Sequence, residues 1–241
     1  MSGFFQTLFY QPILNLLVYL YNIFGDLGLA ILFLTIIIKV VLFPLSKKSI
    51  KSQKALQELQ PEIEKLKEKY KDDKHAQSVA LMELYKKNEV NPFSSCLPLL
   101  IQLPFLIAIF RVFKDGFAQN HLDLLYSFVN NPEIINTMTL GYFDLAQTSV
   151  YLAVLAGLAQ FWQSRMMHTK KPEVKTEGSK DEKMLSIMNK QMLYVMPVIT
   201  VLIGLQFPAG LTLYWFLTTL FTAVQQKIIF SKIKSPVKVL K

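Results

Sequence analysis

Long apolar blocks alternate with strongly basic blocks along this chain, and no other feature constrains its fold as much. The 241 residues are 52% hydrophobic but only 18% charged, whereas a soluble domain carries about 25% charged residues. One crossing of a bilayer needs about 20 consecutive, mostly apolar residues. The sequence therefore predicts an all-α membrane protein with several transmembrane helices.

Five apolar blocks are predicted to be these transmembrane helices. They cover residues 27–46, 94–114, 146–166, 191–207 and 210–230. Only Pro208 and Ala209 separate the last two blocks, and Gly210 begins the second of them. Because proline and glycine favour turns, we expect a tight turn there rather than a loop.

The first 26 residues are apolar and aromatic, but polar residues and a proline interrupt them. These interruptions are Gln6, Gln11, Pro12, Asn15 and Asn22. We interpret residues 1–26 as an amphipathic helix in the extracytoplasmic membrane interface. A further span is the alternative, but it would leave almost no loop before the next one.

The distribution of lysine and arginine predicts the orientation, because basic loops remain in the cytoplasm. Segments 1–26 and 115–145 contain neither residue, whereas 47–91 contains eleven, 167–190 contains six and 227–241 contains five. With five crossings of the membrane, every basic segment lies on one side, and every segment without lysine or arginine lies on the other. We therefore expect an N-terminus outside the cell, and cytoplasmic segments at 47–92, 167–190 and 231–241.

The first basic segment has the periodicity of a helical hairpin. Apolar residues recur at spacings of three and four from Leu56 to Tyr70, which is typical of an amphipathic helix. A charged break at residues 71–74 is followed by a second helical stretch. We expect an antiparallel hairpin that binds partners, the alternative being a solvated hairpin without one. The predicted contacts are Leu56, Leu59, Pro61, Ile63, Leu66, Tyr70 and Leu84.

Lys39 lies deep within the first predicted span, between three isoleucines and the run Val-Val-Leu. A lysine at this depth costs roughly 2.5–3.5 kcal/mol on insertion scales. Its side chain could extend to the cytoplasmic surface, or it could line a water-filled cavity open to the cytoplasm. The second interpretation is favoured because the helix is expected to continue about seven residues beyond Lys39.

Other polar residues favour the same cavity. They occur within three of the predicted spans, and one of them, Thr35, lies one helical turn from Lys39. They are Thr35, Gln102, Thr218, Thr219, Thr222, Gln225 and Gln226. Individually, each could make an ordinary hydrogen bond between helices. Together with Lys39 they predict a polar groove that attracts acidic groups.

At these residues the chain resembles the YidC family of membrane insertases (YidC/Oxa/Alb type), from about residue 4 to residue 230. The resemblance rests on short motifs around prolines and on two pairs of residues in the last predicted span. The motifs are Phe43-Pro44-Leu45, Gln60-Pro61, Asn91-Pro92, Cys96 to Pro104, Met196-Pro197, Phe207 to Leu211, Tyr214-Trp215 and Gln225-Gln226. It implies a short form without a large extracytoplasmic domain.

The resemblance implies a membrane protein insertase and chaperone in a bacterial plasma membrane. A charged groove would receive the hydrophilic tail of a nascent membrane protein, whose apolar segment then enters lipid. Tyr214 and Trp215 join the expected groove. The implied partners are nascent membrane proteins and the bilayer, with the Sec translocon, the signal recognition particle receptor and the ribosome as further candidates. Lys39 stands where the family usually has arginine.

Two other functions remain open: a small-anion transporter that uses Lys39, and a scaffold that acts through the hairpin. We expect no metal site, because the single Cys96 and the three histidines are scattered. A nucleophile–base pair is not found within the predicted spans, so we do not expect an enzyme. The resemblance likewise implies no cofactor, and we expect no sequence-specific binding of nucleic acids.

Overall fold

The computed structural model describes residues 3–91, 97–115, 124–132, 134–167 and 191–232. The predicted loop at 168–190 and the tail from 233 onward lie outside these residues. The elements, in chain order, are α1 (Gly3–Phe5), the π-helical η1 (Gln6–Tyr10), α2 (Gln11–Phe24), α3 (Leu27–Val41), α4 (Phe43–Lys69), α5 (Lys74–Lys87), α6 (Leu97–Asp115), β1 (Met138–Thr139), β2 (Phe143–Asp144), α7 (Val150–Met167), the π-helical η4 (Gln191–Val195), α9 (Met196–Gly204) and α10 (Ala209–Lys232).

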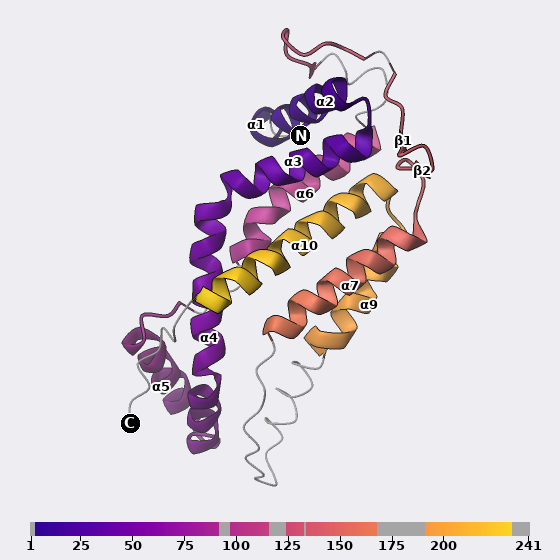
Figure 1. Cartoon of the computed structure of the whole chain (residues 1–241). Helices are drawn as coiled ribbons and strands as arrows, with labels where there is room; N and C mark the ends of the chain where they lie inside the picture. Colours follow the sequence, from indigo (N-terminus) through magenta and orange to yellow (C-terminus); the bar gives the residue numbers. More distant parts are fainter. Residues whose placement is uncertain (1–2, 92–96, 116–123, 133, 168–190, 233–241) are drawn as a thin grey trace.

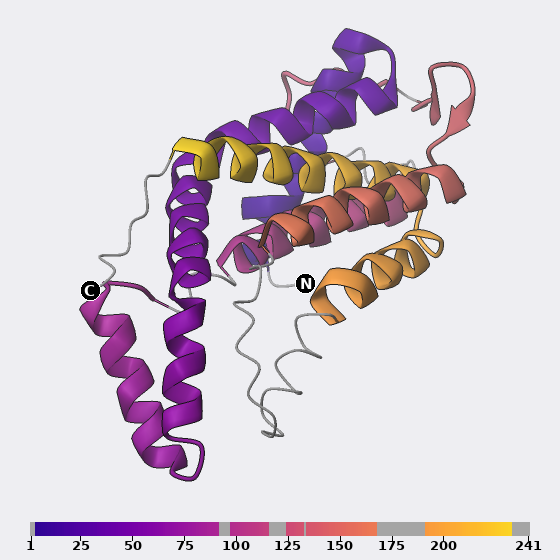
Figure 2. The same ribbon diagram turned by 60° about the horizontal axis from the view of Figure 1, so that its bottom comes forward.

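The helices form a bundle from which one helical hairpin projects. In Figures 1 and 2, α10 runs between α3 and α7, with α9 against α7 and α2 against α3. The lower part of α4 stands apart from this bundle together with α5 (Figure 1). The fold is therefore mostly helical, as predicted. The number of membrane crossings stays a prediction.

Helix α3 ends earlier than the sequence suggested. A single helix was expected to Ser46, but α3 ends at Val41 and α4 begins at Phe43, with 69° between the two axes. Pro44 explains the break: its ring would clash with the carbonyl of residue 40 and it has no N–H to donate in a continuous helix. In the first turn of α4, the same proline is tolerated.

None of the described helices is, taken singly, both long enough and apolar enough to qualify as a membrane span. The bent pair of α3 and α4 meets the criterion when its two helices are taken together, by length and composition.

The predicted hairpin consists of α4 and α5. Asp73 caps α5 by accepting hydrogen bonds from the backbone N–H groups of residues 75 and 76. Leu59 and Ile63 are buried and pack against Leu84 and other apolar residues of the second helix. Leu59 and Ile63 therefore hold the hairpin together, which corrects the expectation that these two face a partner. Leu84 is partly buried, and its contact with a partner stays a prediction.

The other predicted contact residues of the hairpin are partly buried. They are Leu56, Pro61, Leu66 and Tyr70. The large apolar side chains exposed on α5 are Val79 and Met82, at 39% and 65% exposure. Sequence periodicity did not single out these two.

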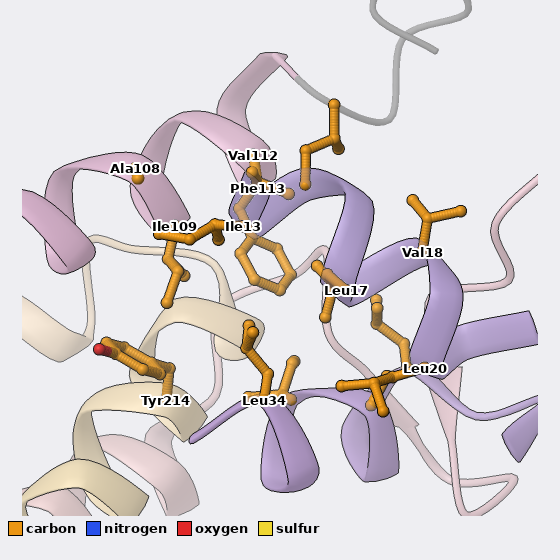
Figure 3. Close-up of a cluster of buried hydrophobic side chains, with 14 of the residues drawn as sticks. Ile13, Leu17, Val18, Leu20, Leu34, Ala108, Ile109, Val112, Phe113 and Tyr214 are labelled. Carbon is orange, nitrogen blue, oxygen red and sulfur yellow. The ribbon is translucent and has the colours of Figure 1, made fainter. Parts of the chain in front are cut away.

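The main apolar core lies between α2, α3, α6 and α10. Figure 3 shows Leu17 of α2, Leu34 of α3, Ile109 of α6 and Tyr214 of α10 converging on one cluster. Helix α2 thus has one face in the core. Whether its other face lies in a membrane interface stays a prediction.

Polar residues of α2 bind the segment that follows α6. Asn15 accepts a hydrogen bond from the backbone N–H of Tyr126 and donates to the carbonyl of Leu124, and Gln11 donates to the same carbonyl. Asn22 donates to the carbonyl of Asn130. The residues that looked like interruptions of an apolar helix therefore attach a distant segment to it.

Candidate functional site

Helix α10 carries a row of polar residues that we call the polar stripe: Tyr214, Thr218, Thr222 and Gln226. They are spaced by four, which keeps them close to one face of a helix. Each step of four residues exceeds one turn by about 40°. The polar stripe therefore winds around α10, and three of its four residues contact different neighbouring helices.

At its first level, the polar stripe meets α6. The side-chain amide of Gln102 donates a hydrogen bond to the hydroxyl of Tyr214. Tyr214 is only 1% exposed, and in Figure 3 its ring borders the apolar cluster with its oxygen pointing away from it. Two predicted groove residues from different helices are thus brought together.

One turn further on, the polar stripe passes from α6 towards α3. Thr218 is buried, and its backbone carbonyl accepts a hydrogen bond from the hydroxyl of Thr222 at 2.7 Å. The next residue, Thr219, is buried as well.

The third level of the polar stripe holds the charge. The ammonium of Lys39 on α3 donates to the hydroxyl of Thr222 at 2.8 Å. Within the described residues, Lys39 is therefore held by a neutral hydroxyl, unlike Lys54 of α4, which pairs with Glu58. A cation without a nearby carboxylate is able to attract an anionic group.

At its last level, the polar stripe reaches α4 and α7. The amide of Gln226 donates to the side-chain oxygen of Gln53 at 3.1 Å and lies 3.8 Å from the sulfur of Met167. Gln226 is 2% exposed. This residue was expected to line the groove, and in this structure it lies between three helices.

Three predicted groove residues lie beside the polar stripe rather than in it. Thr35 is fully buried, and its hydroxyl donates to the carbonyl of Ile31 on its own helix. Trp215 and Gln225 are partly buried. Each is the sequence neighbour of a residue of the polar stripe, so it is turned about 100° away around α10.

The sequence interpretation missed two glutamines of α4, Gln53 and Gln57. Gln53 is buried, and Gln57 donates to the backbone carbonyl of Met166 at 3.3 Å. Their spacing of four was a signal, because it places both on one face of the helix. That signal was obscured by the many lysines of the segment, which are typical of a solvated surface.

The arrangement suits binding rather than covalent chemistry. It combines one positive charge with hydroxyl and amide groups that exchange hydrogen bonds readily with water or with a peptide. Such groups recognise polar chain segments without demanding a particular sequence. The site therefore offers one positive charge and several hydrogen-bonding groups for noncovalent contacts.

Comparison with known proteins gives the same family throughout. The family described as "60Kd inner membrane protein" matches residues 19–236. The chain is 35% identical over 208 residues to the "Membrane protein insertase YidC" of Fusobacterium nucleatum, covering 86% of this chain and 88% of that protein. It is 35% identical over 225 residues to the protein of the same name from Pelobacter propionicus, of which it spans only 38%.

The fold also resembles a solved structure. The crystal structure described as "Active YidC insertase crystal structure with the first transmembrane domain resolved" superposes with a TM-score of 0.59. The match covers 95% of this chain and 47% of that one, at 24% identity. At this level of identity, the likeness concerns the fold alone.

Proposed function

Because the chain belongs to the YidC family of membrane protein insertases, we propose that it inserts nascent membrane proteins into the plasma membrane of a bacterium and assists their folding there. The observation that carries the proposal at the level of residues is the contact between Lys39 and Thr222. It places a cation on a row of neutral polar groups within helices whose other residues are largely apolar.

The proposed topology has five spans, an extracytoplasmic N-terminus and a cytoplasmic C-terminus. Basic segments alternate along the chain with segments that contain no lysine or arginine, and this alternation supports the orientation. In the proposed arrangement, α4 and α5 stand in the cytoplasm, and residues 1–26 and 115–145 lie outside. The bent pair of α3 and α4 then carries the chain from the membrane into the hairpin.

In the proposed mechanism, the polar tail of a client protein enters a hydrated groove from the cytoplasm. Transfer of a polar peptide group into an apolar medium without a hydrogen bond costs several kcal/mol. The hydroxyls and amides of the polar stripe, together with Gln102, offer replacement hydrogen bonds. Lys39 adds attraction for acidic side chains, and the apolar segment of the client then moves into lipid.

The hairpin is the proposed site for cytoplasmic partners. Because Leu59 and Ile63 are buried, we assign the contact to the exposed Val79 and Met82, with the lysines around them. A flexible methionine adapts to varied apolar surfaces. The candidate partners are the Sec translocon, the signal recognition particle receptor and the ribosome.

The proposal is tested by reconstituting the purified chain into liposomes. The client is a short membrane protein with one apolar segment and an acidic N-terminal tail, and insertion is measured as protection of the tail from added protease. We expect protection well above that in liposomes without the protein. Equal protection in both would exclude an insertase.

A further inference from the structure

Three helices meet at the end of the polar stripe in a cluster that we call the amide junction. It consists of Gln53 and Gln57 of α4, Gln226 of α10 and the last residues of α7. Gln226 donates to Gln53 at 3.1 Å, and Gln57 donates to the carbonyl of Met166 at 3.3 Å. These bonds join segments that are 173 and 109 positions apart in the chain.

Among the described residues, two hydrogen-bond acceptors of the amide junction are unpaired. The side-chain oxygens of Gln57 and Gln226 are buried, and neither has a hydrogen-bond partner in the part of the chain that the structure describes. The oxygen of the adjacent Gln225 is in the same situation. Rotating the amide of Gln226 would only exchange which of its two polar atoms is unpaired.

Such groups are rare in folded proteins, because a buried acceptor that has given up water without finding a donor destabilises the folded state. Two of them lie in the amide junction, and the third belongs to Gln225, the sequence neighbour of Gln226. Apolar side chains of the same size would fill the space without this penalty. The unpaired oxygens therefore offset part of the stabilisation from the two hydrogen bonds, and leave the contact between α4 and the bundle weaker than an apolar contact of the same size.

The position of the amide junction indicates which movement a weak contact there would permit, namely that of the hairpin relative to the bundle. The buried Ser49 and Ile50 anchor the start of α4, and Lys54 lies over the ring of Phe230 at 5.4 Å. Beyond the amide junction, the same helix continues into the hairpin with α5, away from the bundle (Figure 2). The amide junction is thus the last strongly buried polar contact before α4 leaves the bundle.

We propose that the amide junction is a latch between the hairpin and the bundle, which opens when a client chain supplies hydrogen-bond donors to its unpaired glutamine oxygens. An unfolded backbone carries one N–H per residue, except at proline, and so offers such donors whatever its sequence. Gln226 lies one turn beyond Thr222, the partner of Lys39. Acidic groups of a client would thus bind Lys39 while its backbone N–H groups bind the opened latch.

The second half of this inference rests on the proposed function, whereas the latch itself does not. The test uses the variants Gln57→Met and Gln226→Met, because methionine has nearly the size and flexibility of glutamine but no amide. Gln206→Met is the matched control, since Gln206 is exposed in the turn after α9 and its side chain donates to the carbonyl of Leu202 at the end of that helix. Hydrogen–deuterium exchange of residues 49–60 is followed in liposomes, and insertion is measured in parallel.

We expect Gln57→Met to exchange several-fold more slowly over residues 49–60 and to unfold at a higher temperature than the wild type. The gain should be smaller in Gln226→Met, which also removes the donor to the oxygen of Gln53. Both variants should also insert the client several-fold less well, because the latch opens less often. The control should behave as the wild type in all three measurements.

Faster exchange, or a lower unfolding temperature, in the correctly folded Gln57→Met variant would overturn the latch, since the glutamines would then stabilise the joint. Slower exchange with unchanged insertion would overturn its link to client binding. If the wild type itself inserted nothing, the proposed function would fail, but the exchange data would still decide whether the latch exists.

Discussion

The ammonium of Lys39 donates a hydrogen bond of 2.8 Å to the hydroxyl of Thr222, a residue 183 positions later in the chain. Thr222 in turn donates to the carbonyl of Thr218 on its own helix. This pair joins the first long apolar helix of the bundle to the last. It holds the charge of Lys39 with a neutral, exchangeable partner, so that an acidic group on a client could replace Thr222.

Replacing Lys39 with alanine is expected to lower insertion of a client with an acidic tail by about tenfold. This corresponds to losing roughly 1.4 kcal/mol of attraction, a modest value for one charge at intermediate dielectric. Lys39→Arg should retain most activity because the charge remains. Initial rates of protease protection in liposomes provide the measurement.

The same experiment with a neutral client tail separates charge from structure. If attraction is the reason for the loss, Lys39→Ala should then reduce insertion much less. An equal loss with acidic and neutral tails would mean that Lys39 acts through the fold rather than through its charge.

Substituting Thr222 with valine should lower insertion about two- to threefold. The loss is smaller than for Lys39→Ala because the charge is kept and only one hydrogen bond, worth about 0.5–1.5 kcal/mol, is removed. Thr222→Ser keeps the hydroxyl and should behave as the wild type. Thr219→Val, three residues earlier on α10 and at a buried position, is the control for a general effect of valine in α10; a loss of the same size there would argue against a specific role for Thr222.

The sequence predicted the mostly helical fold because apolar blocks and helical periodicity are properties of short stretches. It did not predict that α3 ends at Val41, since the effect of Pro44 depends on which turn of a helix it occupies. Nor did it predict the attachment of Asn15 to residues 124 and 126, which depends on contacts more than 100 positions apart.

Within the candidate site, the sequence identified the unusual residues but not their partners. Lys39 was conspicuous because a charge inside an apolar block is costly, and the spacing of four in α10 was visible in the sequence. The pairing of Gln226 with Gln53 was not, because Gln53 lies in a lysine-rich helix that looks solvated. The place of Gln225, beside the stripe, follows from the direction in which α10 faces its neighbours.

Gly210→Ala is expected to destabilise the bundle by about 1–3 kcal/mol, the usual effect of overpacking. A β-carbon at Gly210 would overlap the ring of Phe113, which is buried between α6 and α10. The thermal unfolding midpoint in detergent is the measurement. Gly3→Ala is the control, since no atom lies within 4 Å of a β-carbon there, and a similar shift in both variants would contradict the packing argument.

Acid should weaken the attachment of the β1–β2 segment to the start of α3. Partial burial raises the pKa of Asp26, but hydrogen bonds from the hydroxyl of Thr139 and the backbone N–H groups of Leu140 and Leu29 outweigh it, so the pKa lies below its usual 3.8. A carboxylate with a lowered pKa stabilises the fold above its usual pKa. That stabilisation is lost as the pH falls from about 4 through the lowered value.

Asp26→Asn isolates this contribution, because asparagine does not titrate and cannot accept at both positions. We expect the variant to be about 1 kcal/mol less stable at neutral pH, the usual effect of losing a hydrogen bond of this kind. The difference in unfolding midpoint from the wild type should shrink as the pH falls below 4.

A second carboxylate does not disturb this comparison. The pKa of Asp144 is lowered by hydrogen bonds from Thr137 and the N–H of Ala146, but Asp144 is present in both proteins, so its contribution to the difference cancels. A difference that stayed constant down to pH 3 would show that the charge of Asp26 does not matter.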